Sequence, residues 1–92
     1  MSRVAGETPS AVIDDVGRKI AELRRERGWT QQEAAEQLRM PLKNFQRVEA
    51  GMNLTIRTLV RIARGLDVPT RTLFDPPNRR EKRRRGRPRR SD

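Results

Sequence analysis

The fold is decided by residues 30–51, TQQEAAEQLRMPLKNFQRVEAG, whose pattern predicts two short helices joined by a tight turn. Thr30 and Glu33 have the spacing of a capping box, in which the threonine hydroxyl accepts from the N–H of Glu33 and the carboxylate accepts from the N–H of Thr30. A helix therefore begins at the next residue. Pro41 cannot continue this helix but suits the first turn of another, so the break falls at residues 39–40.

The second of these helices has one apolar face and one polar, cationic face. Phe45 and Val48 recur at helical spacing and are predicted to point inward together. The side chains left facing outward are those of Leu42, Lys43, Asn44, Gln46 and Arg47. The apolar stripe of the first helix consists of Ala34, Ala35 and Leu38. The pair therefore packs through its apolar faces and presents a cationic helix face to a partner outside.

Three further helical segments are predicted around this pair. Pro9 suits the first residue of a long first helix, which Gly28 ends. Thr55 caps a fourth helix that ends at Gly65, and a last turn or short helix begins near Thr70. The residues assigned to the apolar side of these segments are Ile13, Val16, Ile20, Leu23, Ile56, Leu59, Val60, Ile62, Ala63, Leu66, Val68, Leu73 and Phe74. Without a strand signal, the expected fold class is all-α with five helices.

Residues 16–74 resemble the lambda-repressor-like helix-turn-helix family, also called the Cro or xenobiotic-response-element type. The resemblance rests on GRKIAELRRERGWTQQEAAEQL, the turn, a second helix of the pair ending in VEAG, and TIRTLVRIARGLDVPTRTLF. It covers nearly two thirds of the chain. It implies a five-helix DNA-binding domain in which the second helix of the pair enters the major groove.

Two residues depart from the family pattern. The family usually has glycine where Arg39 stands, at the sharp turn, and a larger aliphatic residue where Ala34 stands. A residue other than glycine with positive φ costs about 1 kcal/mol. The turn is therefore expected to be either slightly reshaped or strained, without loss of the fold.

The resemblance implies base contacts from the second helix of the pair, because base edges in the major groove carry a distinguishable pattern of donors and acceptors. The residues placed there are Leu42, Lys43, Asn44, Arg47 and, as a weaker candidate, Gln46. Guanine suits Lys43 or Arg47, and adenine suits Asn44. Phosphate contacts are expected from Gln31, Gln32, Asn53 and Thr55. The alternative is an ordinary solvated helix face.

Glu49 lies beside these residues in sequence but does not share their chemistry, since a carboxylate repels phosphate. It is interpreted as structural, paired with an arginine of the first helix. Trp29, one residue before the Thr30 cap, is interpreted as a hydrophobic staple that packs back on the domain.

The net charge of +10 is concentrated near the C-terminus, where residues 79–92 hold nine basic and two acidic residues. A segment without apolar side chains cannot bury enough surface to fold alone, so residues 75–92 are predicted to be a disordered basic tail. It contains an RGRP sequence formed by Arg85, Gly86, Arg87 and Pro88, which resembles the AT-hook. In that motif a Gly-Arg-Pro core lies extended in a narrow A·T minor groove. The alternative is a tail that binds phosphates without sequence preference.

The predicted organisation is a flexible N-terminus (1–8), a helix-turn-helix domain (9–74) and the tail. The chain contains no Cys and no His, which excludes disulfides, zinc fingers and imidazole metal sites. Without Cys, His or Tyr and without a phosphate-cradling loop, neither an enzyme nor a cofactor is expected. No apolar run approaches the roughly 20 residues of a membrane span, so the expected location is the cytoplasm, in association with the nucleoid.

The sequence is compatible with three functions. The first is a sequence-specific transcriptional regulator, most simply a repressor, that binds double-stranded DNA. The resemblance implies that it binds a palindromic site as a homodimer. No separate dimerisation domain is expected from the sequence. The second is the antitoxin of a toxin-antitoxin pair, which binds its own promoter and a toxin protein. The third is an architectural nucleoid protein in which the basic tail dominates.

Overall fold

The computed structural model describes residues 7–77. These residues form four α-helices and one 3-10 helix, with no strand among them: α1 (Pro9–Glu26), α2 (Gln31–Leu38), α3 (Leu42–Gly51), α4 (Ile56–Leu66) and η2 (Thr70–Phe74). The all-α expectation is confirmed. The fifth segment, however, is a short 3-10 helix, because Pro69 and Pro76 bound it and its turns close through i to i+3 hydrogen bonds such as that from the Thr72 N–H to the Pro69 carbonyl (2.9 Å).

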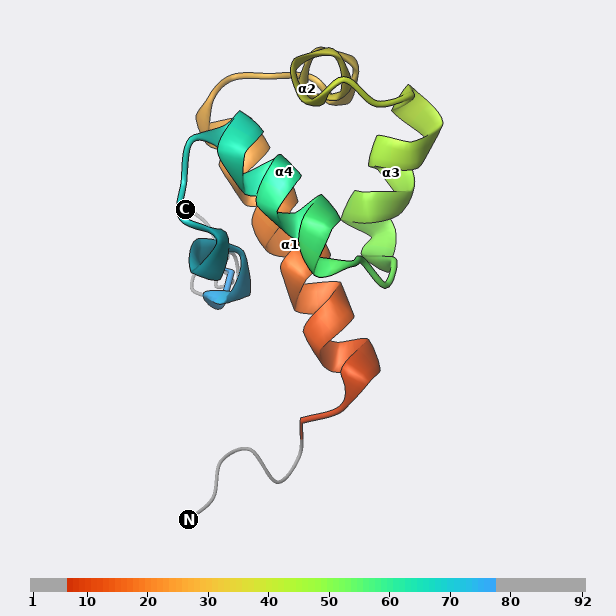
Figure 1. Cartoon of the computed structure of the whole chain (residues 1–92), viewed down its shortest axis with the longest axis vertical. Coiled ribbons are helices and arrows are strands. Elements are labelled where there is room, and N and C mark those ends of the chain that lie inside the picture. The colour runs from red at the N-terminus through yellow and green to blue at the C-terminus, as the bar shows by residue number, and fades with distance from the viewer. Residues whose placement is uncertain (1–6, 78–92) are drawn as a thin grey trace, which may run out of the picture.

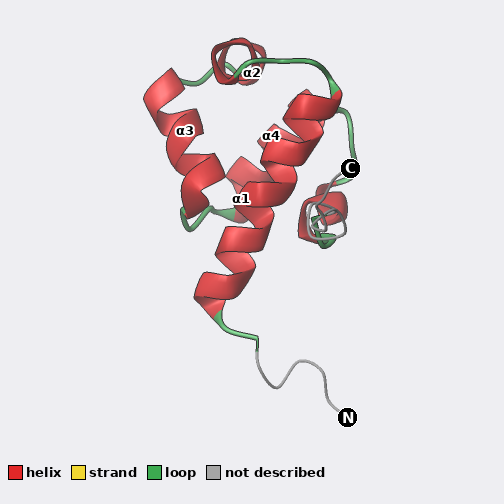
Figure 2. Ribbon diagram, turned by 180° about the vertical axis from the view of Figure 1, so that it is seen from behind, coloured by secondary structure: helices red, strands yellow, loops and turns green. Residues whose placement is uncertain are grey.

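The long helix α1 is the element against which the others pack. Its N-terminus is capped by Thr8, whose hydroxyl accepts from the N–H of Ala11 at 3.1 Å. Figures 1 and 2 show α1 running through the molecule beside α3 and α4, with its N-terminal turns extending beyond them. At Gly17 the contact with α3 is so close that a Cβ atom would lie 2.7 Å from the carbonyl oxygen of Glu49. A side chain at this position would therefore push α1 and α3 apart.

The helix pair has the local structure that its sequence predicts. Both halves of the capping box are present: the Thr30 hydroxyl accepts from the N–H of Glu33 at 3.0 Å, and the Glu33 carboxylate accepts from the N–H of Thr30 at 2.8 Å. After α2 the chain turns sharply at Arg39, and α3 begins directly after Pro41. The orientation of α3 relative to α2 is therefore set within three residues.

A single apolar core joins all five segments. Phe45, Ile20, Ile62, Leu66 and Leu73 are fully buried in it. The other core members are Val16, Leu23, Ala34, Ala35, Leu38, Val48, Leu59 and Ala63. Trp29 is half-buried and packs against this core, as expected of a staple. The faces of α2 and α3 that meet the core are thus the alanine-rich stripe and the Phe45 side.

Three residues assigned to the core from sequence are exposed instead. Ile56 is 71% exposed, Val60 37% and Phe74 51%. On α4 the spacing of Leu59, Ile62, Ala63 and Leu66 already defines the buried face, and Ile56 and Val60 lie at its side. A helix on the surface of a small domain buries one stripe only, so apolar residues outside that stripe remain in solvent.

Arg39 occupies the left-handed conformation that the family usually reserves for glycine, with φ 57° and ψ 49°. The turn is therefore strained rather than reshaped. Left-handed geometry costs a side-chain-bearing residue roughly 1–2 kcal/mol, and glycine avoids this cost. The greater conformational freedom of glycine in the unfolded chain offsets part of that gain. We expect Arg39→Gly to raise the free energy of unfolding by about 0.5–1 kcal/mol in urea denaturation.

The contact that Arg39 makes through its backbone survives this substitution. Arg61 donates from Nη2 to the carbonyl oxygens of Leu38 (3.1 Å) and Arg39 (2.6 Å), and glycine keeps that carbonyl. The matched control is Arg18→Gly in the middle of α1, an exposed helical position where glycine is expected to lower stability by about 1 kcal/mol. Equal losses of unfolding free energy at both positions would mean that the left-handed turn carries no strain.

Candidate nucleic-acid interface

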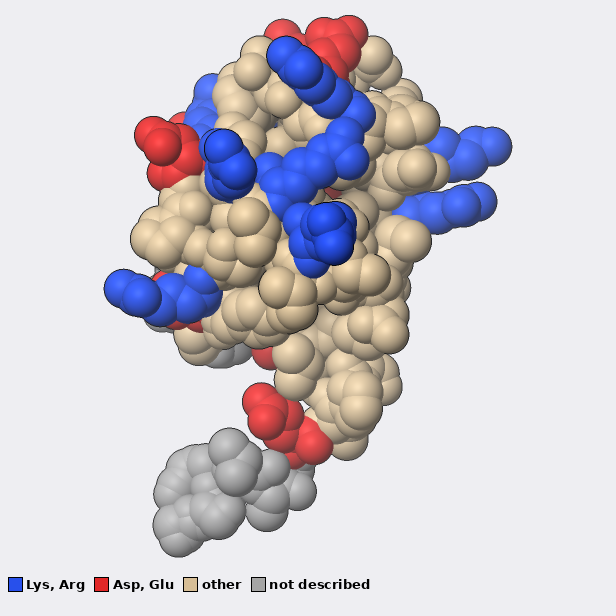
Figure 3. All heavy atoms as spheres, in the orientation of Figure 1, with Lys and Arg blue, Asp and Glu red and all other residues tan. Residues whose placement is uncertain are grey.

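The outer face of α3 carries most of the predicted base-contacting residues. Lys43, Asn44, Gln46 and Arg47 are exposed on it, whereas Phe45 and Val48 hold the opposite face in the core. Figure 3 shows cationic side chains projecting from the side of the molecule on which α3 lies. The helix is therefore anchored on one side and offers two cationic and two amide side chains on the other.

Leu42 differs from this set. It was expected to face outward, but it is half-buried and packs against the core. The reason is its place three residues before Phe45, which puts both side chains on the same side of α3. Only part of Leu42 is left for contact with a partner.

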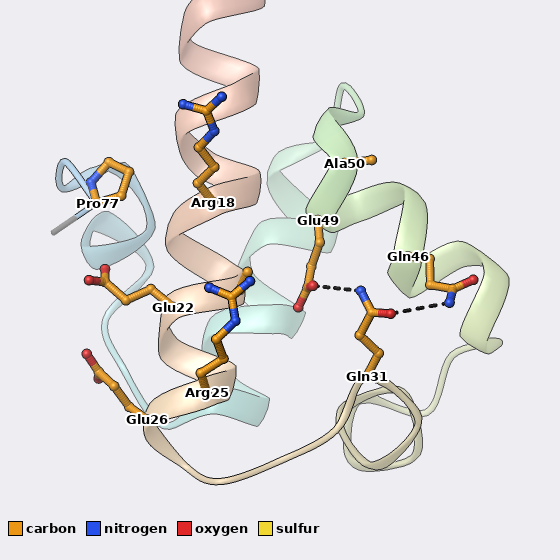
Figure 4. Close-up of a pocket in the computed structure, with 10 residues that line it drawn as sticks. Arg18, Glu22, Arg25, Glu26, Gln31, Gln46, Glu49, Ala50 and Pro77 are labelled. Atoms are coloured by element: carbon orange, nitrogen blue, oxygen red, sulfur yellow. Dashed lines mark hydrogen bonds between the residues drawn. The ribbon is translucent and has the colours of Figure 1, made fainter. Parts of the chain in front are cut away.

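A chain of hydrogen bonds ties α1, α2 and α3 together beside this face. Arg24 on α1 donates from Nε to the Glu49 carboxylate at 2.6 Å, and the same carboxylate accepts from the side-chain amide of Gln31 at 2.8 Å. The amide of Gln46 in turn donates to the carbonyl oxygen of the Gln31 side chain at 3.3 Å. Figure 4 shows the Glu49, Gln31 and Gln46 part of this chain. One largely buried carboxylate thus fixes three helices relative to one another.

Glu49 therefore has the structural role expected of it, with Arg24 as its partner from the first helix. The two side chains are 8% and 11% exposed respectively, so the ion pair is largely shielded from water. The bond from Gln31 to this pair was not foreseen, although a nearly buried carboxylate beside α2 calls for further donors. The Gln31 side-chain nitrogen donates one of its two hydrogens to Glu49, so its second hydrogen and the Gln31 backbone N–H are the donors left for an outside anion.

The start of α2 keeps backbone donors free for an anion. The capping box uses the N–H groups of Thr30 and Glu33, and those of Gln31 and Gln32 between them have no partner within the helix. The side-chain amide of Gln32 donates to Glu36 at 2.9 Å, along the helix. The helix dipole and these N–H groups together suit a phosphate oxygen.

The start of α4 resembles that of α2. Thr55 caps the helix by accepting from the N–H of Thr58 at 3.1 Å, and its hydroxyl donates to the Thr58 hydroxyl at 3.0 Å. Asn53 is exposed in the loop before it. The two helix starts at Gln31 and Ile56 are therefore the candidate phosphate-binding points of the described chain.

A groove of about 790 Å³ lies between α1 and the helix pair. Its lining residues are Arg18, Ala21, Glu22, Arg25, Glu26, Gln31, Gln46, Glu49, Ala50 and Pro77, and Figure 4 draws them.

Across residues 7–77 no group of three or more acidic, His or Cys side chains is placed to hold a metal ion. The same residues include no helix long and apolar enough to cross a membrane. The minor-groove candidates Arg85, Gly86, Arg87 and Pro88 lie outside the described residues.

Comparison with known proteins adds independent evidence. A family model described as a helix-turn-helix domain matches residues 15–75. The restriction-modification controller protein C.AhdI from Aeromonas hydrophila superposes with a TM-score of 0.65 at 28% identity, covering 70% of this chain and 98% of that one. SinR, the master regulator for biofilm formation, solved in complex with DNA, gives a TM-score of 0.60 at 29% identity, covering 65% of this chain and 98% of that one.

A second restriction-modification controller protein, C.Esp1396I, solved as a point mutant, superposes with a TM-score of 0.62 at 30% identity, covering 68% of this chain and 85% of that one. No curated protein matches the sequence.

Proposed function

This chain belongs to the helix-turn-helix domain family, of the lambda-repressor-like type, and we propose that it is a sequence-specific DNA-binding regulator of transcription that acts as a repressor. Its fold is that of a DNA-binding transcription regulator, similar to restriction-modification controllers and to SinR. In the proposed mode α3 enters the major groove and Lys43, Asn44 and Arg47 contact base edges, with Gln46 beside them.

The observation that carries this proposal is the way α3 is held. Its inner face is immobilised by Phe45 and Val48 in the core, and its side is tied to α2 through the Gln46–Gln31 hydrogen bond. A base-reading group needs a fixed position, since a hydrogen bond weakens steeply when its geometry is lost. The free cationic and amide groups of α3 therefore sit on a rigid support.

Phosphate contacts position the helix in this proposal. The N–H groups at the start of α2, near Gln31 and Gln32, and those at the start of α4, near Asn53 and Thr55, would each hold one backbone of the duplex. Binding as a homodimer to a palindromic site and insertion of the tail into an adjacent minor groove complete the proposed complex. A repressor of this kind acts by occupying its operator and excluding polymerase.

The test is selection of bound fragments from genomic DNA by the full-length chain, followed by competition with random DNA. We expect one recurring sequence and a specificity ratio above about 10³ at 0.1–0.15 M salt. A ratio below that value, with binding that depends on salt alone, would favour an architectural protein. A protein that copurifies with the chain in a fixed ratio and releases it from the promoter would favour an antitoxin.

A further inference from the structure

The groove between α1 and the helix pair holds two cationic side chains that the proposed function leaves unused. Arg18 and Arg25 both stand on α1 and both line the groove. They are seven residues apart, so they share one face of the helix, separated by about 10.5 Å along its axis. In Figure 4 both side chains project from α1, with Gln31 and Gln46 on the other side of the groove.

Both arginines are available for an outside partner. They are exposed, and within residues 7–77 neither guanidinium group forms a hydrogen bond or an ion pair. This distinguishes them from Arg24, which is committed to Glu49, and from Arg27, which donates to the Leu23 carbonyl at 2.9 Å. Their positive charge is therefore not neutralised by an ion pair within the described domain.

The carboxylates of the same groove do not cancel this charge. Glu49 is neutralised by Arg24, and Glu22 lies 3.0 Å from the Lys19 ammonium. Glu26 is the remaining exposed carboxylate of the lining. Outside the two ion pairs, the lining therefore holds two guanidinium groups and one carboxylate, and the groove keeps a net positive charge.

The opposite wall of the groove belongs to the candidate DNA interface. Gln31 opens α2, where a phosphate is proposed to bind, and Gln46 lies on α3, which is proposed to enter the major groove. A DNA strand that meets the start of α2 therefore passes the mouth of this groove. Its phosphates recur every 3.4 Å or so along the duplex axis, so residues about 10.5 Å apart reach two different phosphates of one strand.

We propose that Arg18 and Arg25 form a phosphate track on α1, which binds the backbone of the strand whose phosphate lies at the start of α2. The inference rests on the proposed function and extends it from the helix pair to a third helix. Such contacts carry no sequence information, so the track contributes affinity and register and leaves base discrimination to α3.

The test compares two double variants that remove the same charge. Arg18→Ala with Arg25→Ala is expected to make the slope of log K against log salt shallower by about 2, and to weaken binding roughly tenfold to a hundredfold at 0.1 M salt. The loss should be equal on cognate and scrambled duplexes. Arg64→Ala with Arg71→Ala removes two exposed arginines outside the groove, and should change the slope by less than about half a unit.

Three results would overturn the track. Equal slope changes in both double variants would show an effect of overall charge, and an unchanged slope would show no contact. A changed ratio between cognate and scrambled duplexes would show that the arginines act through α3. Arg18→Lys with Arg25→Lys keeps the charge and should keep the slope, which separates a phosphate contact from a folding defect. Because the slope is measured on any duplex, failure of base discrimination in the unmodified chain would refute the proposed function and not the track.

Discussion

Replacing Lys43, Asn44 and Arg47 together with alanine is expected to abolish discrimination between the cognate duplex and a scrambled one. The three side chains are exposed on α3, and they form no hydrogen bond or ion pair within the described domain. Each good contact with a base edge contributes about 1–3 kcal/mol of discrimination, so three correspond to at least about a hundredfold in the specificity ratio. Alanine also favours the helix, so the fold should persist.

The measurement is competition binding with both duplexes, alongside thermal denaturation to confirm the fold. A matched control, Gln37→Ala with Arg64→Ala and Arg71→Ala, removes one amide and two cations from exposed positions outside α3. It should weaken binding slightly and leave the ratio unchanged. If the α3 triple variant still discriminates between the two duplexes as the unmodified chain does, α3 does not read sequence and the proposed function fails.

Removing the basic tail, by ending the chain at Pro77, is expected to make the slope of log K against log salt shallower by about 6. Residues 79–92 carry a net charge of +7, and each phosphate neutralised contributes about −0.9 to the slope. This is the largest change in salt dependence expected from any variant of this chain. It is measured by titrating one duplex at several salt concentrations; an unchanged slope would exclude a binding role for the tail.

A second variant decides between the two interpretations of RGRP. Gly86→Ala with Pro88→Ala keeps every charge but removes the close approach and the extended backbone that a narrow minor groove requires. An AT-hook should lose its preference for sites flanked by A·T pairs, with the salt slope preserved. A tail that binds phosphates without sequence preference should show no change with either flank.

Much of the domain was predictable because it depends on neighbours in sequence. The capping box of Thr30 and Glu33, the break before Pro41 and the inward placement of Phe45 and Val48 all follow from spacings of three or four residues. The exposure of Lys43, Asn44, Gln46 and Arg47 on α3 follows in the same way, by difference from the buried positions. The pairing of Glu49 with an arginine of α1 was inferred from its charge alone, since a carboxylate does not suit a DNA-facing surface.

The errors on α4 and η2 concern contacts between distant segments. Periodicity marks Ile56, Val60 and Phe74 as apolar but cannot say how wide the buried stripe of a helix is, because that width depends on what packs against it. Leu42 is a different error, because its spacing of three residues from Phe45 already places it beside the buried face of α3, where it packs against the core. The 3-10 form of η2 follows from its two bounding prolines, yet its docking beside α1 is a tertiary event.

The sequence by itself determined which residues form the helix pair, which of its side chains remain polar and free, and where the positive charge of the chain is concentrated. Only the tertiary structure decided that Arg39 accepts a left-handed turn, that Gln31 is tied to the Arg24–Glu49 pair, and that Arg18 and Arg25 share a groove with the candidate interface. The physical reason is the range of the forces: caps and helix periodicity act within one or two turns, whereas a buried ion pair and a shared groove join residues that meet only after the chain has folded.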